Sequence, residues 1–200
     1  MGFFKRSDQK SNDSATTKDA EKAYELFIEA QKRMEKRDYK KAEKLLNDSI
    51  KLDSSNNEAW LSKAALYIIT KKYKDSIESS RESIKIDDTN PRAWGALAVA
   101  LGDDGKTDEA EKALLKAIEL EPDGKGWIFT LGGLYLNMGE WAKSKEQLER
   151  VVEIDPEFLP AHHLLFQVYT AHLSLSTDPK DRDKFALKAA MAHMKAQGKL

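Results

Sequence analysis

Apolar residues recur along the chain at helical spacing, and the pattern they form repeats every 34 residues. Within each segment they stand three or four positions apart, which predicts amphipathic helices. One column of the repeat is always β-branched and apolar: Ile50, Ile84, Ile118 and Val152. A fixed period between about 20 and 50 residues is typical of a solenoid, in which each unit buries its apolar face against its neighbours.

Other columns keep the same step and divide each unit into two helices. A small residue recurs at Ala42, Ser76, Ala110 and Ser144, and an acid recurs at Asp53, Asp87, Glu121 and Asp155. Gly105 and Gly139 stand where a first helix must turn into a second, since glycine tolerates the positive φ of such turns. The predicted helices are 57–70 and 73–86, 91–103 and 107–120, and 125–138 and 141–154.

The two ends of the chain depart from the repeat. Residues 7–18 contain one apolar side chain, Ala15, and cannot offset the entropy of ordering, so residues 1–18 are expected to form a flexible tail. A fifth unit begins at Leu159, but a polar stretch from Ser174 to Asp183 replaces its turn. A final helix over about 182–197 is expected to cap the array.

These columns resemble the tetratricopeptide repeat, whose unit of 34 residues places Trp, Leu-Gly and Tyr on the first helix and small residues on the second. The matching residues include Trp60, Ala64 and Tyr67, then Trp94, Leu97, Ala98 and Ala110, then Leu131, Gly132, Tyr135 and Ser144. The resemblance implies an all-α fold, a right-handed α-solenoid of antiparallel helix pairs. Its domain spans 19–199, with repeats at 23–56, 57–90, 91–124 and 125–158 and a modified fifth hairpin or cap at 159–199.

Composition narrows the functional classes. Formal net charge is −1, so no global field attracts nucleic acid or an anionic membrane. The chain has no cysteine, which excludes disulfides and thiolate metal sites. No stretch approaches the roughly 20 apolar residues that span a bilayer, and the N-terminus has no signal-peptide core. The sequence therefore predicts a cytoplasmic protein without integral membrane insertion.

The resemblance also implies a binding surface, because first helices of such repeats line a concave groove that holds a peptide or helix of another protein. The expected groove is apolar, with small residues at its middle that allow a partner's backbone to approach. The candidate residues are Tyr24, Phe27, Gln31, Leu61, Ala65, Ile68, Arg92, Ala96, Val99, Phe129, Gly133, Leu136, Asn137, His163 and Gln167. The predicted function is that of a non-catalytic adaptor or scaffold.

The sequence also suggests alternatives to the adaptor function. The chain could be a self-associating structural protein whose groove or C-terminal helix forms a homo-oligomer interface. The groove could also be filled from within, by Phe3-Phe4 of the segment Phe3-Phe4-Lys5-Arg6 or by a second copy. An RNA-binding helical repeat would have a basic face, which is absent. A clamp for the acidic end of a heat-shock chaperone fits only at Arg92 and is rejected.

Catalytic and metal-binding chemistry finds no support in the sequence. Gly105-Lys106-Thr107 matches a permissive phosphate-loop pattern, but a helix precedes it where the mechanism needs a strand. The four histidines, His162, His163, His172 and His193, offer no pair spaced for a shared zinc site and are expected on the surface or groove of the fifth hairpin. We expect no enzyme activity, cofactor or metal.

Overall fold

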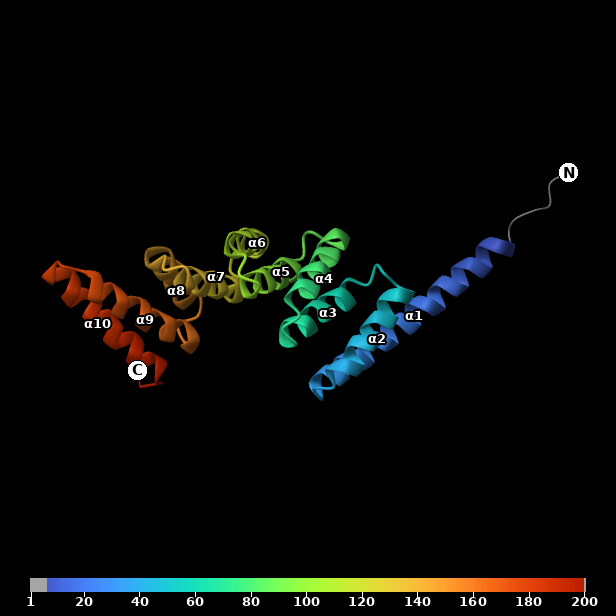
Figure 1. Ribbon diagram of the computed structural model, residues 1–200, viewed down its shortest axis with the longest axis horizontal. Helices are drawn as coiled ribbons and strands as arrows, with labels where there is room; N and C mark the ends of the chain where they lie inside the picture. The colour runs from blue at the N-terminus through green and yellow to red at the C-terminus, as the bar shows by residue number, and fades with distance from the viewer. Residues whose placement is uncertain (1–6, 200) are drawn as a thin grey trace. The chain divides into compact units, whose positions relative to one another are not determined.

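The computed structural model describes residues 7–199, with side chains described from Thr17 onward. This part of the chain forms ten α-helices and no strand (Figure 1). The helices are α1 (Ser7–Glu35), α2 (Tyr39–Leu52), α3 (Asn57–Ile69), α4 (Tyr73–Ile86), α5 (Pro91–Asp103), α6 (Thr107–Leu120), α7 (Lys125–Asn137), α8 (Trp141–Ile154), α9 (Leu159–Leu175) and α10 (Pro179–Ala196).

The chain divides into two compact units, Met1–Ala100 and Leu101–Leu200. In the first unit α1 packs on α2, α2 on α3 and α3 on α4. In the second unit α6, α7, α8, α9 and α10 pack on one another in chain order. The all-α architecture of helix pairs predicted from the repeat is therefore confirmed.

Close helix crossings lie where the small-residue columns predicted them. The buried Ser76 hydroxyl donates a hydrogen bond of 2.9 Å to the Ala64 carbonyl, and 68 residues later Ser144 donates one of 2.8 Å to Gly132. Ala64 is fully buried and Ala98 is 2% exposed. Because each hydroxyl bonds to the backbone of its partner helix, a small polar residue is tolerated inside the crossing.

The turn between paired helices has one geometry in four units. Arg37, Lys71, Gly105 and Gly139 stand 34 residues apart, and all four have φ between 57° and 81°. At each turn this residue donates its N–H to the carbonyl three residues back, and the next residue donates to the carbonyl five back, as from Lys72 to Tyr67. This is the Schellman pattern, which satisfies carbonyls at a helix end.

The acidic column ends the second helices rather than forming a reactive site. Asp53 Oδ1 accepts from the N–H of Ser55, Asp87 Oδ1 from Thr89 and Asp155 Oδ1 from Glu157, at 3.0–3.1 Å. A side chain that bonds the backbone two residues on forms an Asx turn, which stabilises the connection to the next first helix.

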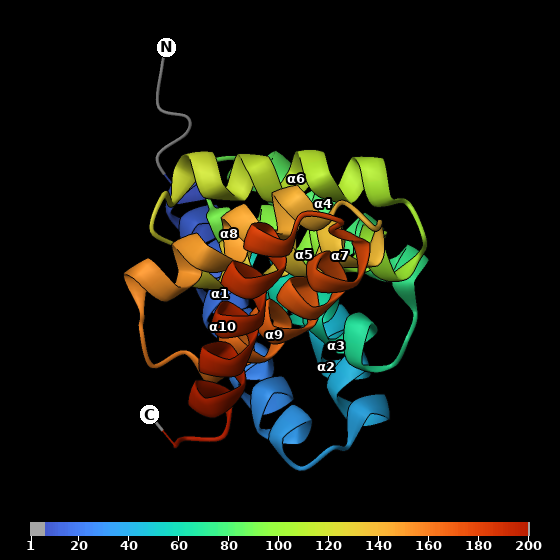
Figure 2. The ribbon, with the colours of Figure 1, turned by 90° about the vertical axis from the view of Figure 1, so that its left-hand side faces the viewer.

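The fifth hairpin differs from the expectation. α9 has 17 residues against 13 in α7, and α10 has 18 against 14 in α8. The polar stretch predicted over 174–183 is thus mostly helix, and α10 begins at Pro179 rather than near Arg182. Asp178 caps α10 by accepting from the N–H of Lys180 at 2.9 Å, so polar residues here start a helix instead of extending a loop. Figure 2 shows α9 and α10 side by side.

The N-terminal boundary also differs. Residues 7–18, expected to belong to a flexible tail, continue α1 as helix, while residues 1–6 lie outside the described part. The side chains from Thr17 to Lys22 are exposed. A helix already formed adds further turns at little cost, so a segment with few apolar residues can continue it.

Candidate functional site

The first helices of each unit carry the predicted groove, and within each unit they touch. α1 contacts α3 in the first unit, and α7 contacts α9 in the second. We use the name inner face for the fifteen predicted residues, taken separately in each unit. Nine of them belong to the first unit and six, from Phe129 to Gln167, to the second.

A cavity of about 320 Å³ in the first unit brings four of the predicted residues together. Gln31 comes from α1, Leu61 and Ala65 from α3, and Arg92 from α5. Met34, Glu35 and Ser62 complete the lining. Four of these seven lining residues are polar or charged, so this cavity is more polar than the groove expected from the sequence.

Arg92 is held in place at the rim of this cavity. Its Nη1 donates to both carboxylate oxygens of Glu58, at 2.9 and 3.2 Å. Both side chains are largely exposed, so the pair orients the guanidinium more than it stabilises the fold. Ala65 beside it is exposed and small, which leaves room for a partner's backbone.

The remaining inner-face residues of the first unit are unequally accessible. Phe27 and Leu61 are each 5% exposed and belong to the core, although Leu61 also lines the cavity. Tyr24 is 59% exposed and its ring lies 5.9 Å from that of Phe27. Ile68, Ala96 and Val99 are half-buried.

In the second unit the inner face is apolar at its base and polar at its edge. Phe129 and Leu136 are half-buried, and Phe129 makes an edge-to-face contact of 5.3 Å with Phe158. Gly133 is half-buried, and a Cβ there would stand 3.9 Å from Leu164, an ordinary contact. Asn137, His163 and Gln167 are exposed.

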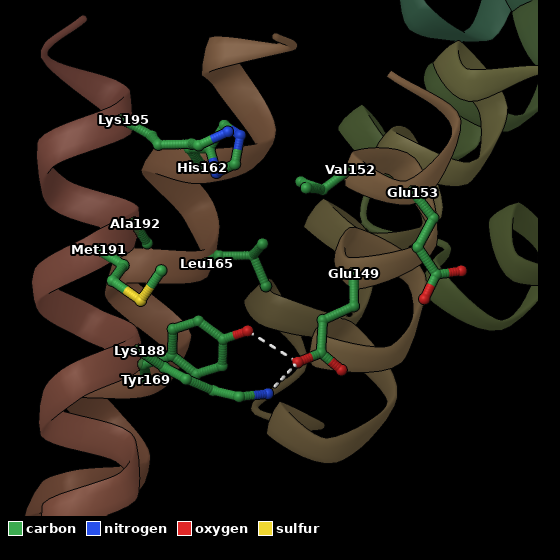
Figure 3. Close-up of a pocket in the computed structure, with 10 residues that line it drawn as sticks. All are labelled: Glu149, Val152, Glu153, His162, Leu165, Tyr169, Lys188, Met191, Ala192 and Lys195. Carbon is green, nitrogen blue, oxygen red and sulfur yellow. Dashed lines mark hydrogen bonds and ion pairs between the residues drawn. The ribbon is translucent and has the colours of Figure 1, made fainter. Parts of the chain in front are cut away.

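A larger cavity, of about 550 Å³, was not anticipated from the sequence. It lies in the second unit between α8, α9 and α10 (Figure 3). Leu165 and Tyr169 form part of its lining from α9, and they lie on the side of that helix opposite His163 and Gln167. The cavity is therefore separate from the inner face.

Figure 3 shows Tyr169 and Lys188 converging on Glu149 at one end of this cavity. The Tyr169 hydroxyl and Lys188 Nζ each donate to Glu149 Oε1 at 2.7 Å. Burial acts to raise the pKa of the Glu149 carboxyl, but the hydrogen bonds from Lys188 and Tyr169 outweigh it and hold that pKa low. Burial, together with the Glu149 hydrogen bond, raises the pKa of the Tyr169 phenol.

The same pairing of tyrosine and glutamate recurs elsewhere. Tyr67 donates to Glu43 at 3.0 Å in the first unit, and Tyr135 donates to Glu111 at 2.6 Å in the second. Burial and the paired carboxylate raise the pKa of both phenols. Because the pairs join neighbouring helices in both units, we read them as structural ties and not as catalytic groups.

The segment that matches a phosphate loop is a helix turn. The N–H of Gly105 bonds to Gly102 O at 3.1 Å and that of Lys106 to Leu101 O at 2.9 Å. Lys106 Nζ is paired with Asp104 at 2.7 Å. These amides face carbonyls of α5, so they do not form the cradle that a phosphate needs.

The histidines are placed differently from the expectation in one case. His162 is 5% exposed, and its Nε2 lies 2.7 Å from the carbonyl oxygen of Pro156. It stands in the register of Trp60 and Trp94, whose Nε1 donate in the same way to carbonyls six residues upstream. Across residues 17–199, no cluster of three His, Cys, Asp or Glu is arranged to hold a metal ion.

The helix pairs, the constant turn and the small-residue crossings define a helical-repeat scaffold. The tetratricopeptide repeat family matches residues 29–91 and again residues 101–167. The chain belongs to the tetratricopeptide repeat family, as its columns indicated. Such repeats are scaffolds for protein interaction.

Solved structures with the same fold include three that illustrate its range. MamA is 26% identical, with 85% of this chain and 95% of that chain covered and a TM-score of 0.74. PilF of Pseudomonas aeruginosa is 16% identical, with coverage of 91% and 78% and a TM-score of 0.76. YrrB, described as a TPR protein with an unusual peptide-binding site, is 19% identical, with coverage of 86% and 89% and a TM-score of 0.66.

Comparison with curated protein sequences gives no match. Among the helices of residues 7–199, none combines the length and apolar character that crossing a bilayer requires.

Proposed function

We propose that this protein is a non-catalytic adaptor that holds a peptide or an amphipathic helix of another protein against its inner face. The observation that carries the proposal is the cavity of about 320 Å³ where Gln31, Leu61, Ala65 and Arg92 meet. Residues from three successive first helices line this cavity. A groove that binds a partner segment across several repeats needs such contributions from each repeat.

The lining indicates the chemistry of the segment that fits. Ala65 and the half-buried Ile68 offer apolar contact on α3, while Gln31 and Arg92 offer hydrogen bonds on either side. An extended or helical segment with one apolar side chain between polar neighbours satisfies both. The exposed polar groups fix orientation and the apolar contact adds affinity.

The test is a pull-down that compares substitutions on the inner face with a matched control. Ala65→Arg and Gly133→Arg each place a long charged side chain on the inner face, one in each unit. Ala142→Arg makes the same kind of change at an exposed site on the second helix α8. We expect partners captured by the wild type and by Ala142→Arg to be lost with Ala65→Arg or Gly133→Arg, at unchanged helicity by circular dichroism.

Capture that survives both inner-face substitutions would overturn the proposal. If the captured partner were a second copy of the chain bound to the inner face, the same substitutions would also remove it. Light scattering over a range of concentrations separates these cases, since a groove filled by self-association gives a mass that grows with concentration and falls in Ala65→Arg.

A further inference from the structure

The outward-facing positions of the second helices set α10 apart from the helices before it. Buried columns align these helices: Ser144, Leu148 and Val151 of α8 correspond to Phe185, Ala189 and Ala192 of α10, each 41 residues later. The step of 41 instead of 34 reflects the added turn in each helix of the fifth hairpin. This alignment identifies equivalent exposed positions.

Three columns that are exposed or half-buried hold charged residues in every earlier second helix. They hold Lys44, Asp48 and Lys51 in α2, Glu78, Glu82 and Lys85 in α4, Lys112, Lys116 and Glu119 in α6, and Glu146, Arg150 and Glu153 in α8. In α10 the same columns hold Leu187, Met191 and Met194, which we call the outer stripe.

The outer stripe is accessible over its whole length. Leu187 is 64% exposed, Met191 52% and Met194 42%. In the earlier second helices these positions are charged, as is usual for positions that meet water. Three large apolar side chains at positions i, i+4 and i+7 instead form a surface that a helix can cover.

The outer stripe continues into the cavity between α8, α9 and α10. Met191 belongs to both, since it stands in the stripe and also lines the cavity (Figure 3). Val152, Leu165 and Ala192 give the cavity an apolar wall and floor. A volume of about 550 Å³ accommodates a large side chain of a partner. A flat bilayer surface cannot fill such a hollow, whereas a helix can insert a side chain into it.

Charge indicates the kind of helix. α10 carries four lysines and one arginine against two aspartates, and two of the lysines, Lys188 and Lys195, pair with Glu149 and Glu157. By contrast, α8 carries three basic and three acidic residues. Lys180 and Lys184 are exposed beside the stripe, and Lys199 is exposed just beyond the helix. A second copy of α10 would bring like charges together, and an acidic helix would bring opposite charges together.

We propose that a helix of another protein, with an apolar face flanked by acidic residues, docks along the outer stripe of α10 and inserts one large apolar side chain into the cavity. Methionine is unbranched and adaptable, which suits a surface that must close around such a side chain. The cavity lies on the side of α9 opposite His163 and Gln167, so this docking surface is separate from the inner-face residues of the second unit.

The experiment measures binding of designed peptides by fluorescence anisotropy. The probe is a labelled amphipathic peptide of about 18 residues, long enough to hold helical structure, with leucines on one face and glutamates on its flanks. A second peptide replaces every glutamate by lysine. We expect the acidic peptide to bind the full chain at least about tenfold more tightly than the basic one, with affinity that falls as salt rises.

The matched variant gives the outer stripe the residues that α8 has there: Leu187→Glu, Met191→Arg and Met194→Glu together. Since all three sites are exposed, the helix content should be kept, and affinity for the acidic peptide should fall at least about tenfold. Met191→Arg alone is the second variant if the triple variant does not fold. Ala142→Arg, at an exposed site of α8 that lines neither cavity, should bind the peptide as the wild type does.

Three results would overturn the proposal. The first is equal binding of the acidic and basic peptides. The second is unchanged binding by the folded variants of the outer stripe. The third is absence of peptide binding while the outer stripe supports self-association in light scattering, or binding to vesicles of phosphatidylserine and phosphatidylcholine, which would assign the surface to a second copy or to a membrane.

Discussion

The hydroxyl of Ser144 donates a hydrogen bond of 2.8 Å to the backbone carbonyl of Gly132, at the point where α8 crosses α7. A Cβ at Gly132 would stand 2.9 Å from both Cγ and Cδ2 of Leu148, which is itself fully buried. The serine and the glycine therefore jointly set the distance between the two helices. Ser144 links them by a hydrogen bond, and Gly132 has no Cβ that would push them apart.

The first prediction concerns this crossing. Gly132→Ala should lower the free energy of unfolding by roughly 1–3 kcal/mol, because the buried Leu148 cannot move away without disturbing its neighbours. Gly133→Ala is the control, since its Cβ would make only an ordinary contact at 3.9 Å and alanine favours helix. Thermal unfolding followed by circular dichroism compares the two, and equal melting temperatures would contradict the account.

The second prediction concerns the turn shared by four units. Lys71 has φ of 58°, a conformation that costs an L residue about 1–2 kcal/mol. Lys71→Gly removes this cost, but glycine also adds conformational entropy to the unfolded chain. The net effect should be a stabilisation of up to about 1 kcal/mol. Gly139→Ala should destabilise it by about 1 kcal/mol, although nothing lies within 4 Å of the added Cβ.

Urea denaturation measures both changes. Since no contact is gained or lost at Gly139, any loss of stability there comes from the backbone alone. Opposite signs for the two variants would support the shared turn, and a neutral result for Gly139→Ala would contradict it.

The third prediction concerns pH. The pKa of Tyr169 is raised in the folded protein, so the neutral phenol contributes stability below its ordinary pKa of about 10 that is lost as pH rises through the folded value. The pKa of Glu149 is lowered, so its contribution is present above about pH 4.3 and is lost on further acidification.

Tyr169→Phe isolates this effect. At neutral pH it should cost about 1–2 kcal/mol through loss of the hydrogen bond to a charged group. Melting temperatures measured from pH 7 to 11 should show the advantage of the wild type shrinking above about pH 10, because the phenol then ionises in the unfolded chain while the folded protein keeps it protonated. Tyr24→Phe, at an exposed site, provides the comparison, and a constant difference for Tyr169→Phe across this range would contradict the role assigned to the pair.

The fourth prediction separates binding from stability at the inner face. Glu58→Gln removes the partner of Arg92, but the pair is exposed and should contribute at most about 1 kcal/mol. The melting temperature should change little, and less at high salt. If Arg92 contacts the bound segment, both Glu58→Gln and Arg92→Gln should reduce the amount of partner captured while the melting temperature stays nearly the same. A pull-down with the two variants measures this.

The repeat let most of the fold be predicted. Helices 73–86, 91–103, 107–120 and 141–154 match the structure at both ends, because packing columns and turn residues mark the same boundaries in each unit. The errors fall at the ends of the array. There α1 begins at Ser7, within the expected tail, and a cap within the polar stretch starts α10 at Pro179.

The candidate site was predictable only in part. The resemblance to the tetratricopeptide repeat implies which residues of a first helix face inward, and four of these residues line one cavity. The sequence does not reveal that Phe27 and Leu61 are almost fully buried, or that Glu35 and Ser62 make the cavity polar. Burial depends on how deeply each side chain reaches between neighbouring helices, which spacing alone does not specify.

The amino-acid sequence by itself determined the helix pairs, their turns and the tight crossings, since these follow from local preferences and a constant period. Only the tertiary structure decided where the surface is hollow and which charges stand beside it. Glu149, Tyr169 and Lys188 lie on three helices and have no shared spacing, so their convergence beside the cavity arises only when α8, α9 and α10 pack.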